Sequence, residues 1–235
     1  MRRPYNCGHV KRAMLTPTGF VKQKKHGMKL TEQIMSNFIL TEATEAVRRK
    51  RGAAGIDHVP ARDIRDYMAE HTGEIRKAVL EMRCMSRPVR RVCIPEPNGK
   101  QRPSGIPTVT DRVVQTATQL AMEPFFNRGS SESSFGFRPG RSQHDVVNQA
   151  LEYMNEWYGW IVDLDIEKYF DTVNHDKPIL LIRTKVKVKA TLHLLRPLLR
   201  ARVMENGIVI QNELGTPQGE PYFGAPSECL SGPAG

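Results

Sequence analysis

The chain has 235 residues, 39% of them hydrophobic, which is enough for one sizeable core or for two small lobes that share a hinge. Its formal charge of +10 favours polyanionic partners such as nucleic acid, although a solvated positive face is an equally open interpretation. Four scattered cysteines form neither a disulfide framework nor a paired-cysteine zinc site, and no apolar run is long enough to span a membrane. A cytoplasmic, globular protein is expected.

The first expected elements are helical. Residues 1–30 form a basic arm with few large apolar side chains, which predicts disorder. Residues 31–50 carry apolar side chains at helical spacing and predict one amphipathic helix with Thr31 as its N-cap. Residues 61–83 predict two short helices, with a break at residues 72–73.

A basic hairpin and two helices follow. The β-prone segments 89–94 and 100–106 flank Pro-Asn-Gly, and an Asn-Gly pair between such segments is a strong hairpin signal. Residues 111–123 predict a core-facing helix that ends at Pro124, because proline cannot donate the next hydrogen bond. Residues 143–157 predict a second core-facing helix.

The remaining segments complete an α+β pattern. Residues 160–166 predict a short apolar strand that ends in acids, and residues 178–190 predict another helix. A second hairpin is expected over residues 203–210, turning on Asn-Gly. The tail at 220–235 has no usable periodicity and is expected to be disordered or foreign to the fold. Helices interleaved with β-hairpins favour the α+β class over a parallel doubly wound sheet.

Two acids at the end of the predicted strand indicate metal chemistry. Residues two apart in a strand share a face, so Asp163 and Asp165 would point the same way. Two such carboxylates repel unless a cation lies between them or one of them is protonated, and Mg²⁺ prefers oxygen ligands of this kind. The alternative is that one acid caps the following helix while the other is solvated.

The sequence around these acids, DLDIEKYFDTVNHD at residues 163–176, resembles the first palm motif of reverse transcriptases encoded by group II introns. By position, the resemblance implies that Asp165 is catalytic and binds metal together with the backbone carbonyl of Ile166. It also implies that Phe170 is the aromatic residue that excludes a nucleotide 2′-hydroxyl group. Asp163 is the weaker candidate ligand.

A stretch earlier in the chain resembles the fingers hairpin of the same family. In PVRRVCIPEPNGKQRPSGIPTVTDRVVQ, residues 88–115, the resemblance implies that Lys100 and Arg102 face an incoming triphosphate and that Arg90 and Arg91 bind nucleic acid. Ammonium and guanidinium groups suit phosphate oxygens. An ordinary solvated basic hairpin is the alternative interpretation.

Two glycine-containing turns extend the resemblance. SFGFRPGRS, residues 134–142, is similar to a family motif whose arginines, here Arg138 and Arg141, contact nucleic acid. The alternative is a tight turn in which both arginines bond to neighbouring carbonyl groups, and the two interpretations are compatible. GTPQG, residues 215–219, is similar to the turn in which Gln218 lies beside the nucleotide. Alone, it would be an ordinary turn.

The resemblance implies a right-hand polymerase fold with fingers and an incomplete palm. Its regions would be a disordered arm at 1–30, a helical amino-terminal extension at 31–87, a fingers-like region at 88–158, a partial palm at 159–219 and an unmatched tail at 220–235. The implied activity is RNA-directed DNA polymerisation with a maturase role. The implied partners are intron RNA as template, a DNA primer and deoxynucleoside triphosphates, with two Mg²⁺ ions in the full-length enzyme.

Several alternatives to an active enzyme stay open. A Tyr-Ala-Asp-Asp segment, which supplies the other metal ligands in this family, is absent from the 235 residues, so we expect the chain alone to be inactive as a truncated form. A non-catalytic protein that binds structured RNA and a decayed fragment are the rival interpretations. A metal-dependent nuclease is disfavoured, because the flanking motifs fit template and nucleotide binding better.

Overall fold

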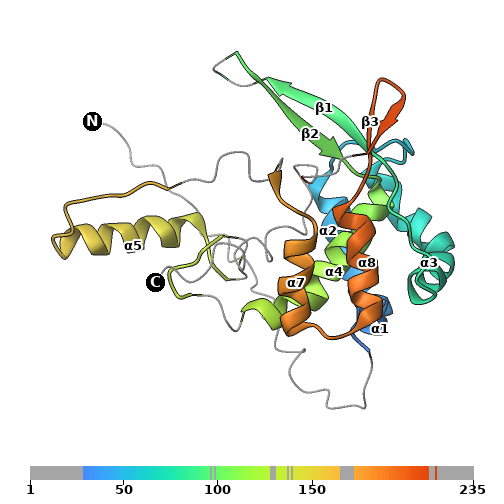
Figure 1. Ribbon diagram of the computed structural model, residues 1–235, viewed down its shortest axis with the longest axis horizontal. Coiled ribbons are helices and arrows are strands. Elements are labelled where there is room, and N and C mark those ends of the chain that lie inside the picture. Colours follow the sequence, from blue (N-terminus) through green and yellow to red (C-terminus); the bar gives the residue numbers. More distant parts are fainter. Residues whose placement is uncertain are drawn as a thin grey trace, which may run out of the picture.

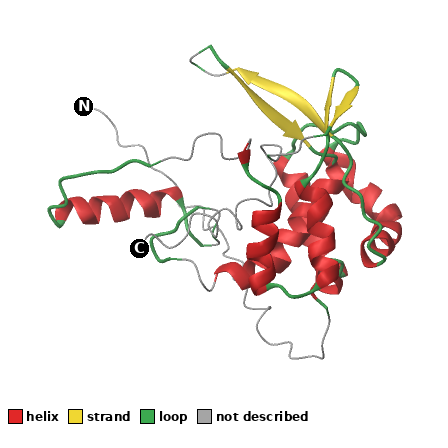
Figure 2. Cartoon of the chain, viewed as in Figure 1, coloured by secondary structure: helices red, strands yellow, loops and turns green. Residues whose placement is uncertain are grey.

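The computed structural model shows an α+β arrangement, as the sequence predicts (Figure 2). It describes residues 29–95, 97, 99–127, 131–136, 138, 140–164, 172–211 and 215. The expected arm up to residue 28 and the expected tail therefore lie outside the described residues. Within the described ranges, no helix has the length and apolar character needed to cross a membrane.

The helix expected over residues 31–50 is two helices. α1 spans Leu30–Ile34 and α2 spans Asn37–Lys50. Ser36 caps α2, because its hydroxyl oxygen accepts a hydrogen bond from the backbone N–H of Ile39 at 3.4 Å. The expected cap, Thr31, is instead buried inside α1. The apolar spacing was compatible with one helix, but the cap at Ser36 starts a new one.

The break expected at residues 72–73 is also wrong. A short 3₁₀ helix, η1 (Ala61–Asp63), leads into α3 (Ile64–Leu80), which runs without interruption through both residues. The Thr72 hydroxyl donates a hydrogen bond to the backbone carbonyl of Met68 inside the helix. Glycine in a helix interior costs only about 1 kcal/mol relative to alanine. Burial of the apolar face of α3 against the core offsets that cost.

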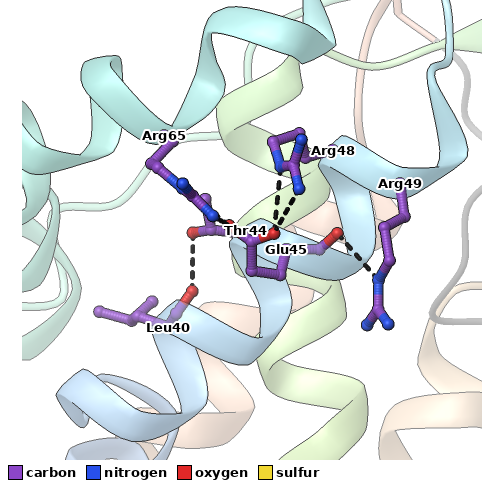
Figure 3. Close-up of polar contacts among 6 residues, drawn as sticks. All are labelled: Leu40, Thr44, Glu45, Arg48, Arg49 and Arg65. Carbon is purple, nitrogen blue, oxygen red and sulfur yellow. Dashed lines mark hydrogen bonds and ion pairs between the residues drawn. The ribbon is translucent and has the colours of Figure 1, made fainter.

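An ion-pair network joins α2 to α3 (Figure 3). The Glu45 carboxylate on α2 accepts hydrogen bonds from Arg65 Nη2 on α3 at 2.5 Å and from Arg48 Nη2 at 2.9 Å. The hydrogen bond from Arg65, and to a smaller extent the one from Arg48, holds the pKa of Glu45 below its usual value. The basic side chains of Arg48 and Arg65 therefore stabilise the fold.

A four-stranded sheet joins the two hairpins. Its strands are β1 (Val89–Pro95), β2 (Gln101–Ile106), β3 (Val203–Glu205) and β4 (Ile208–Ile210), in the order β2-β1-β3-β4. Both antiparallel hairpins are confirmed, and the second turns on Asn206 and Gly207 with φ +51° and +81°. The parallel pairing of β1 with β3, which makes one sheet of two hairpins, was not expected from the sequence.

α4 (Val109–Asn127) passes through Pro124 and does not end there. The proline removes one backbone donor, yet Ala121, Met122 and Phe126 are buried around it and hold the last turns against the core. α4 packs mainly against α2 (Figure 1). Tertiary packing therefore overrides the local stop signal.

α5 (Gln143–Asn155) forms where expected, but the prediction that it faces the core is wrong. It has no buried residue, and Val147, Leu151 and Met154 are more than half exposed. A capping box starts the helix, because Ser142 and Asp145 exchange hydrogen bonds. Figure 1 shows α5 (yellow) lying apart from the other helices. No other element in the described ranges covers its apolar stripe.

The helix expected over residues 178–190 ends earlier than expected, at Lys185, and a further helix that the sequence did not predict follows it. α7 (Asp176–Lys185) and α8 (Lys189–Leu199) form a helical hairpin, with a short non-helical connection between them. Buried side chains from α1, α2, α3, α4, α7 and α8 build one core. In that core, the Thr31 and Thr191 hydroxyl groups share a buried hydrogen bond of 2.9 Å, which ties α1 to α8.

Candidate nucleic-acid interface

The β1–β2 hairpin places two of the predicted cations on one face of the sheet. In the antiparallel register, Arg90 lies opposite Ile106 and Arg102 lies opposite Ile94. Directly opposite residues share a face, and so do alternate residues along a strand. Arg90 and Arg102 therefore lie on the same face, whereas Arg91 lies on the other.

The cations near the tip of this hairpin are exposed, and those near its base are half-buried. Lys100 and Arg102 flank the start of β2 and are exposed, next to a turn in which Gly99 has φ +79°. Arg90 is half-buried, and its Nε atom is buried with no hydrogen-bond partner among the described residues. The tip thus presents positive charge that phosphate oxygens can reach.

A buried acid that the motif analysis passed over fixes the base of the hairpin. Asp111 lies in the first turn of α4, and its Oδ2 atom accepts a hydrogen bond from the backbone N–H of Arg87 at 3.1 Å. Its own backbone N–H donates to the Thr108 hydroxyl oxygen at 3.1 Å. Burial raises the pKa of Asp111 to about 6, against the opposing effect of the contacts with Thr108 and Arg87. The sequence did contain a signal for this buried acid, because Asp111 stands within the otherwise apolar, core-facing pattern of the helix predicted over residues 111–123.

The two arginines of the 134–142 loop are engaged with nearby groups. Arg138 donates through Nε to Asn127 Oδ1 and through Nη1 to the carbonyl oxygen of Ser134, both at 3.0 Å. Arg141 bonds to both the backbone carbonyl and the carboxylate of Glu132. These contacts correspond to the tight-turn interpretation of the motif. A role for either arginine in nucleic-acid binding stays a prediction.

The strand expected over residues 160–166 does not form over residues 160–164, which are the part of this segment that the structure describes. Residues 158–164 have no regular secondary structure, and Asp163 is exposed. The apolar side chains beside it, Trp160 and Leu164, are 94% and 88% exposed. A strand persists only when a neighbouring strand takes up its backbone hydrogen bonds, and the sheet β2-β1-β3-β4 offers none to this segment.

The other predicted site residues, Asp165, Ile166, Phe170 and Gln218, lie outside the described residues. No group of three or more His, Cys, Asp or Glu residues within the described part of the chain could hold a metal ion. The carboxylate of Asp165 and the carbonyl of Ile166 are oxygen donors of the kind that Mg²⁺ prefers. Their assignment as ligands stays a prediction from the sequence.

The model of a known protein family, described as reverse transcriptase (RNA-dependent DNA polymerase), matches residues 94–222, more than half of the chain. The chain belongs to the reverse transcriptase family. The matched residues include the tip of the hairpin, both arginines of the 134–142 loop and the Asp-x-Asp pair. The family resemblance drawn from the sequence is therefore confirmed.

Several known proteins are similar to this chain over part of their length. Protein YkfC of Escherichia coli strain K12 is 33% identical over 186 residues, which cover 77% of this chain and 49% of that protein. The group II intron-encoded protein LtrA of Lactococcus lactis subsp. cremoris is 38% identical over 136 residues, or 56% of this chain and 22% of LtrA. The putative COX1/OXI3 intron 2 protein of Saccharomyces cerevisiae is 35% identical over 133 residues, which cover 56% of this chain and 16% of that protein. The chain spans about half or less of each relative's length.

A solved structure, a partial Cas6-RT-Cas1–Cas2 complex, contains a chain with the same fold. The TM-score is 0.58 at 17% sequence identity, over 87% of this chain and 34% of that chain. The α+β fold expected from the pattern of helices and hairpins is thus confirmed.

Proposed function

We propose that this chain provides the fingers and the first part of the palm of an RNA-directed DNA polymerase of the group II intron type, with a maturase role in binding intron RNA. One observation carries the proposal: the reverse transcriptase family match covers the tip and second strand of the basic hairpin together with the Asp-x-Asp pair. The proposed regions are an amino-terminal extension at 31–87, fingers at 88–158 and a partial palm at 159–219. Intron RNA is the proposed template, and a DNA primer accepts the nucleotides.

The hairpin tip is the proposed triphosphate site. Lys100 and Arg102 neutralise the phosphate charge, and the planar guanidinium group of Arg102 can donate two parallel hydrogen bonds to phosphate oxygens. Phe170 limits the room at the 2′ position of the sugar, and Gln218 contacts the nucleotide through its amide.

The palm acids are the proposed metal site. Asp165 and the backbone carbonyl of Ile166 would hold Mg²⁺, and Asp163 would be the weaker candidate ligand. When bound, Mg²⁺ neutralises the negative charge of the transferring phosphate. The family uses two such ions, so we expect primer extension only from a polypeptide or assembly that also carries a Tyr-Ala-Asp-Asp segment, which these residues lack. Primer extension by the purified 235-residue chain would contradict this.

The remaining predicted cations are the proposed nucleic-acid contacts. Arg90 and Arg91, on opposite faces of β1, would each meet a different strand or segment of the template and primer. Arg138 and Arg141 shape their loop through bonds to neighbouring carbonyl groups, and the donors that remain can meet the sugar-phosphate backbone.

Triphosphate binding tests the hairpin assignment. The affinity of the chain for a fluorescent deoxynucleoside triphosphate would be measured in the presence of an RNA template annealed to a DNA primer. We expect Arg102→Ala to weaken binding roughly tenfold to a hundredfold, because hydrogen bonds to charged groups contribute about 1.5–3 kcal/mol. Gln101→Ala, an adjacent exposed position on the other face of β2, is the control. Equal affinities for both variants would refute the assignment.

Metal-directed cleavage tests the palm assignment without requiring activity. Fe²⁺ in place of Mg²⁺, with ascorbate and peroxide, cuts a polypeptide backbone close to where the metal binds. We expect a cut near residue 165 that Asp165→Asn abolishes and Asp63→Asn, an exposed acid elsewhere, preserves. If Asp165→Asn leaves the cleavage pattern unchanged, Asp165 does not bind the metal. Salt-dependent RNA binding without any metal-directed cut would instead support a non-catalytic RNA-binding protein.

A further inference from the structure

A basic groove lies between α7 and α8, and none of its lining residues belongs to the β1–β2 hairpin or is one of the two palm acids. The two helices lie side by side, in orange in Figure 1, and the groove between them has a volume of about 950 Å³. Five cationic side chains line it: Arg183, Lys187, Lys189, Arg196 and Arg200. The family resemblance assigned no role to any of these residues.

Helical spacing explains why these side chains face one another. On α7, Asp176, Leu180 and Arg183 follow at intervals of three or four residues, and Lys187 continues the series beyond the helix end. On α8, positions 189, 192 and 196 do the same, and Arg200 continues the series just beyond the helix end. Each helix therefore presents one stripe to the groove, and cations occur in both stripes.

The positive charge of the groove is largely unbalanced. Asp176 is the one acid among its lining residues, and it lies 3.4 Å from Arg200. In the described ranges, no ion pair joins Arg183, Lys187 or Arg196 to an acid, and all three side chains are exposed. Like charges gathered on two neighbouring helices repel one another, so an anionic occupant would stabilise this arrangement.

The extent of the groove indicates a polymer and not a single phosphate group. From Lys189 to Arg200 the helix advances about 16 Å at 1.5 Å per residue, so its cations follow one another along the groove and do not converge on one point. Apolar side chains lie between them, and Leu180 is 59% exposed. Cations in a line with apolar surface between them suit a chain of phosphates joined by sugars and bases.

We propose that the α7–α8 groove binds the sugar-phosphate backbone of RNA, as an anchoring site built from residues other than those of the proposed polymerase site. The choice of RNA over another polyanion rests on the proposed function, but the groove requires no metal ion and no catalysis. Its contribution is electrostatic, so it must appear in the salt dependence of RNA binding. The salt dependence of RNA binding can stay the same in a groove variant while Arg102→Ala still weakens triphosphate binding, and the reverse result can also occur. Failure of this proposal and failure of the proposed function are therefore distinguishable.

The test compares two variants of the full chain that lose the same charge. The groove variant carries Arg183→Gln, Lys187→Gln, Lys189→Gln and Arg196→Gln. The control variant carries Arg49→Gln, Lys50→Gln, Arg62→Gln and Lys77→Gln, at exposed positions outside the groove. Binding of a fluorescein-labelled oligouridylate is followed by fluorescence anisotropy over a range of KCl concentrations.

We expect the groove variant to lose about 3 from the slope of log K against log salt, at about 0.7 for each cation that neutralises a phosphate. The control variant should keep the slope of the unmodified chain. If the groove variant does not fold by circular dichroism, its two halves, Arg183→Gln with Lys187→Gln and Lys189→Gln with Arg196→Gln, are each expected to lose about 1.4. Equal slopes for the groove and control variants would overturn the proposal. Displacement of the RNA from the groove by oligoglutamate at equal charge concentration would also overturn it, in favour of an acidic polypeptide partner.

Discussion

Replacing Asp111 with asparagine tests whether one buried carboxyl group makes the stability of this protein depend on pH. Asp111 is only 7% exposed, and burial raises its pKa from 3.8 to about 6. The side-chain carbonyl of asparagine can accept the same hydrogen bond from the backbone N–H of Arg87 without carrying a charge. The substitution therefore removes the charge and keeps the contact.

The sign and size of the effect follow from the two pKa values. The carboxyl group of Asp111 ionises near pH 3.8 in the unfolded chain and near pH 6 in the folded chain, so the folded state holds the proton more tightly. The free energy of unfolding must then fall as the pH rises from about 4 to about 6, and stay low above that range. A difference of about 2 pKa units corresponds to about 3 kcal/mol.

Urea unfolding near pH 4 and near pH 7.5 measures this effect. We expect Asp111→Asn to leave the free energy of unfolding nearly unchanged at the lower pH and to raise it by up to about 3 kcal/mol at the higher pH. Far-UV circular dichroism is the appropriate signal. Tryptophan fluorescence is not, because Trp157 and Trp160 are each 94% exposed and would report little on unfolding of the core.

Two results would refute the reasoning about Asp111. One is a change in the free energy of unfolding that is the same at both pH values, and the other is a loss of stability at the higher pH. The control is Asp163→Asn, which removes an exposed carboxyl group and should shift the free energy of unfolding by no more than about 0.5 kcal/mol at either pH.

Three further predictions concern glycine and cysteine residues. Gly73→Ala should raise the free energy of unfolding by about 0.5–1 kcal/mol in urea unfolding, because its Cβ would meet no atom within 4 Å in the interior of α3. Gly55→Ala should lower it by about 1–3 kcal/mol in the same assay, because its Cβ would lie 2.7 Å from the Cα of Thr108; a gain in stability would contradict that close approach. Iodoacetamide near neutral pH should modify exposed Cys93 well before Cys84, because burial raises the pKa of Cys84 to about 11. Peptide mass mapping measures the order, and modification of Cys84 before Cys93 would contradict the prediction.

The sequence by itself determined the features that depend on a few neighbouring residues. The turn at Asn206 and Gly207 needs positive φ at both positions, which asparagine and glycine tolerate best, so its hairpin was predictable. The first hairpin was predictable as well, because its turn places Gly99 at φ +79°. The ordered motifs that indicated the reverse transcriptase family were also legible in the sequence, because they specify chemistry at fixed spacing.

Helix ends and breaks depended on tertiary packing. Gly73 and Pro124 are local stop signals, yet both lie inside helices because buried neighbours hold the following turns against the core. At Ser36 the opposite occurs, since a side-chain cap divides an apolar pattern that could have continued. Each local preference is about 1–3 kcal/mol, which is no larger than the burial of one or two apolar side chains.

Only the tertiary structure decided which periodic segments have partners. The apolar pattern of α5 and the apolar run at residues 160–164 both predicted buried elements, but the described part of the chain leaves them exposed. Periodicity reports which side chains can be buried together, whereas burial itself requires a complementary surface. The α7–α8 groove has the same origin: each helix carries an ordinary basic stripe, and the groove arises only because the connection after Lys185 folds one stripe against the other.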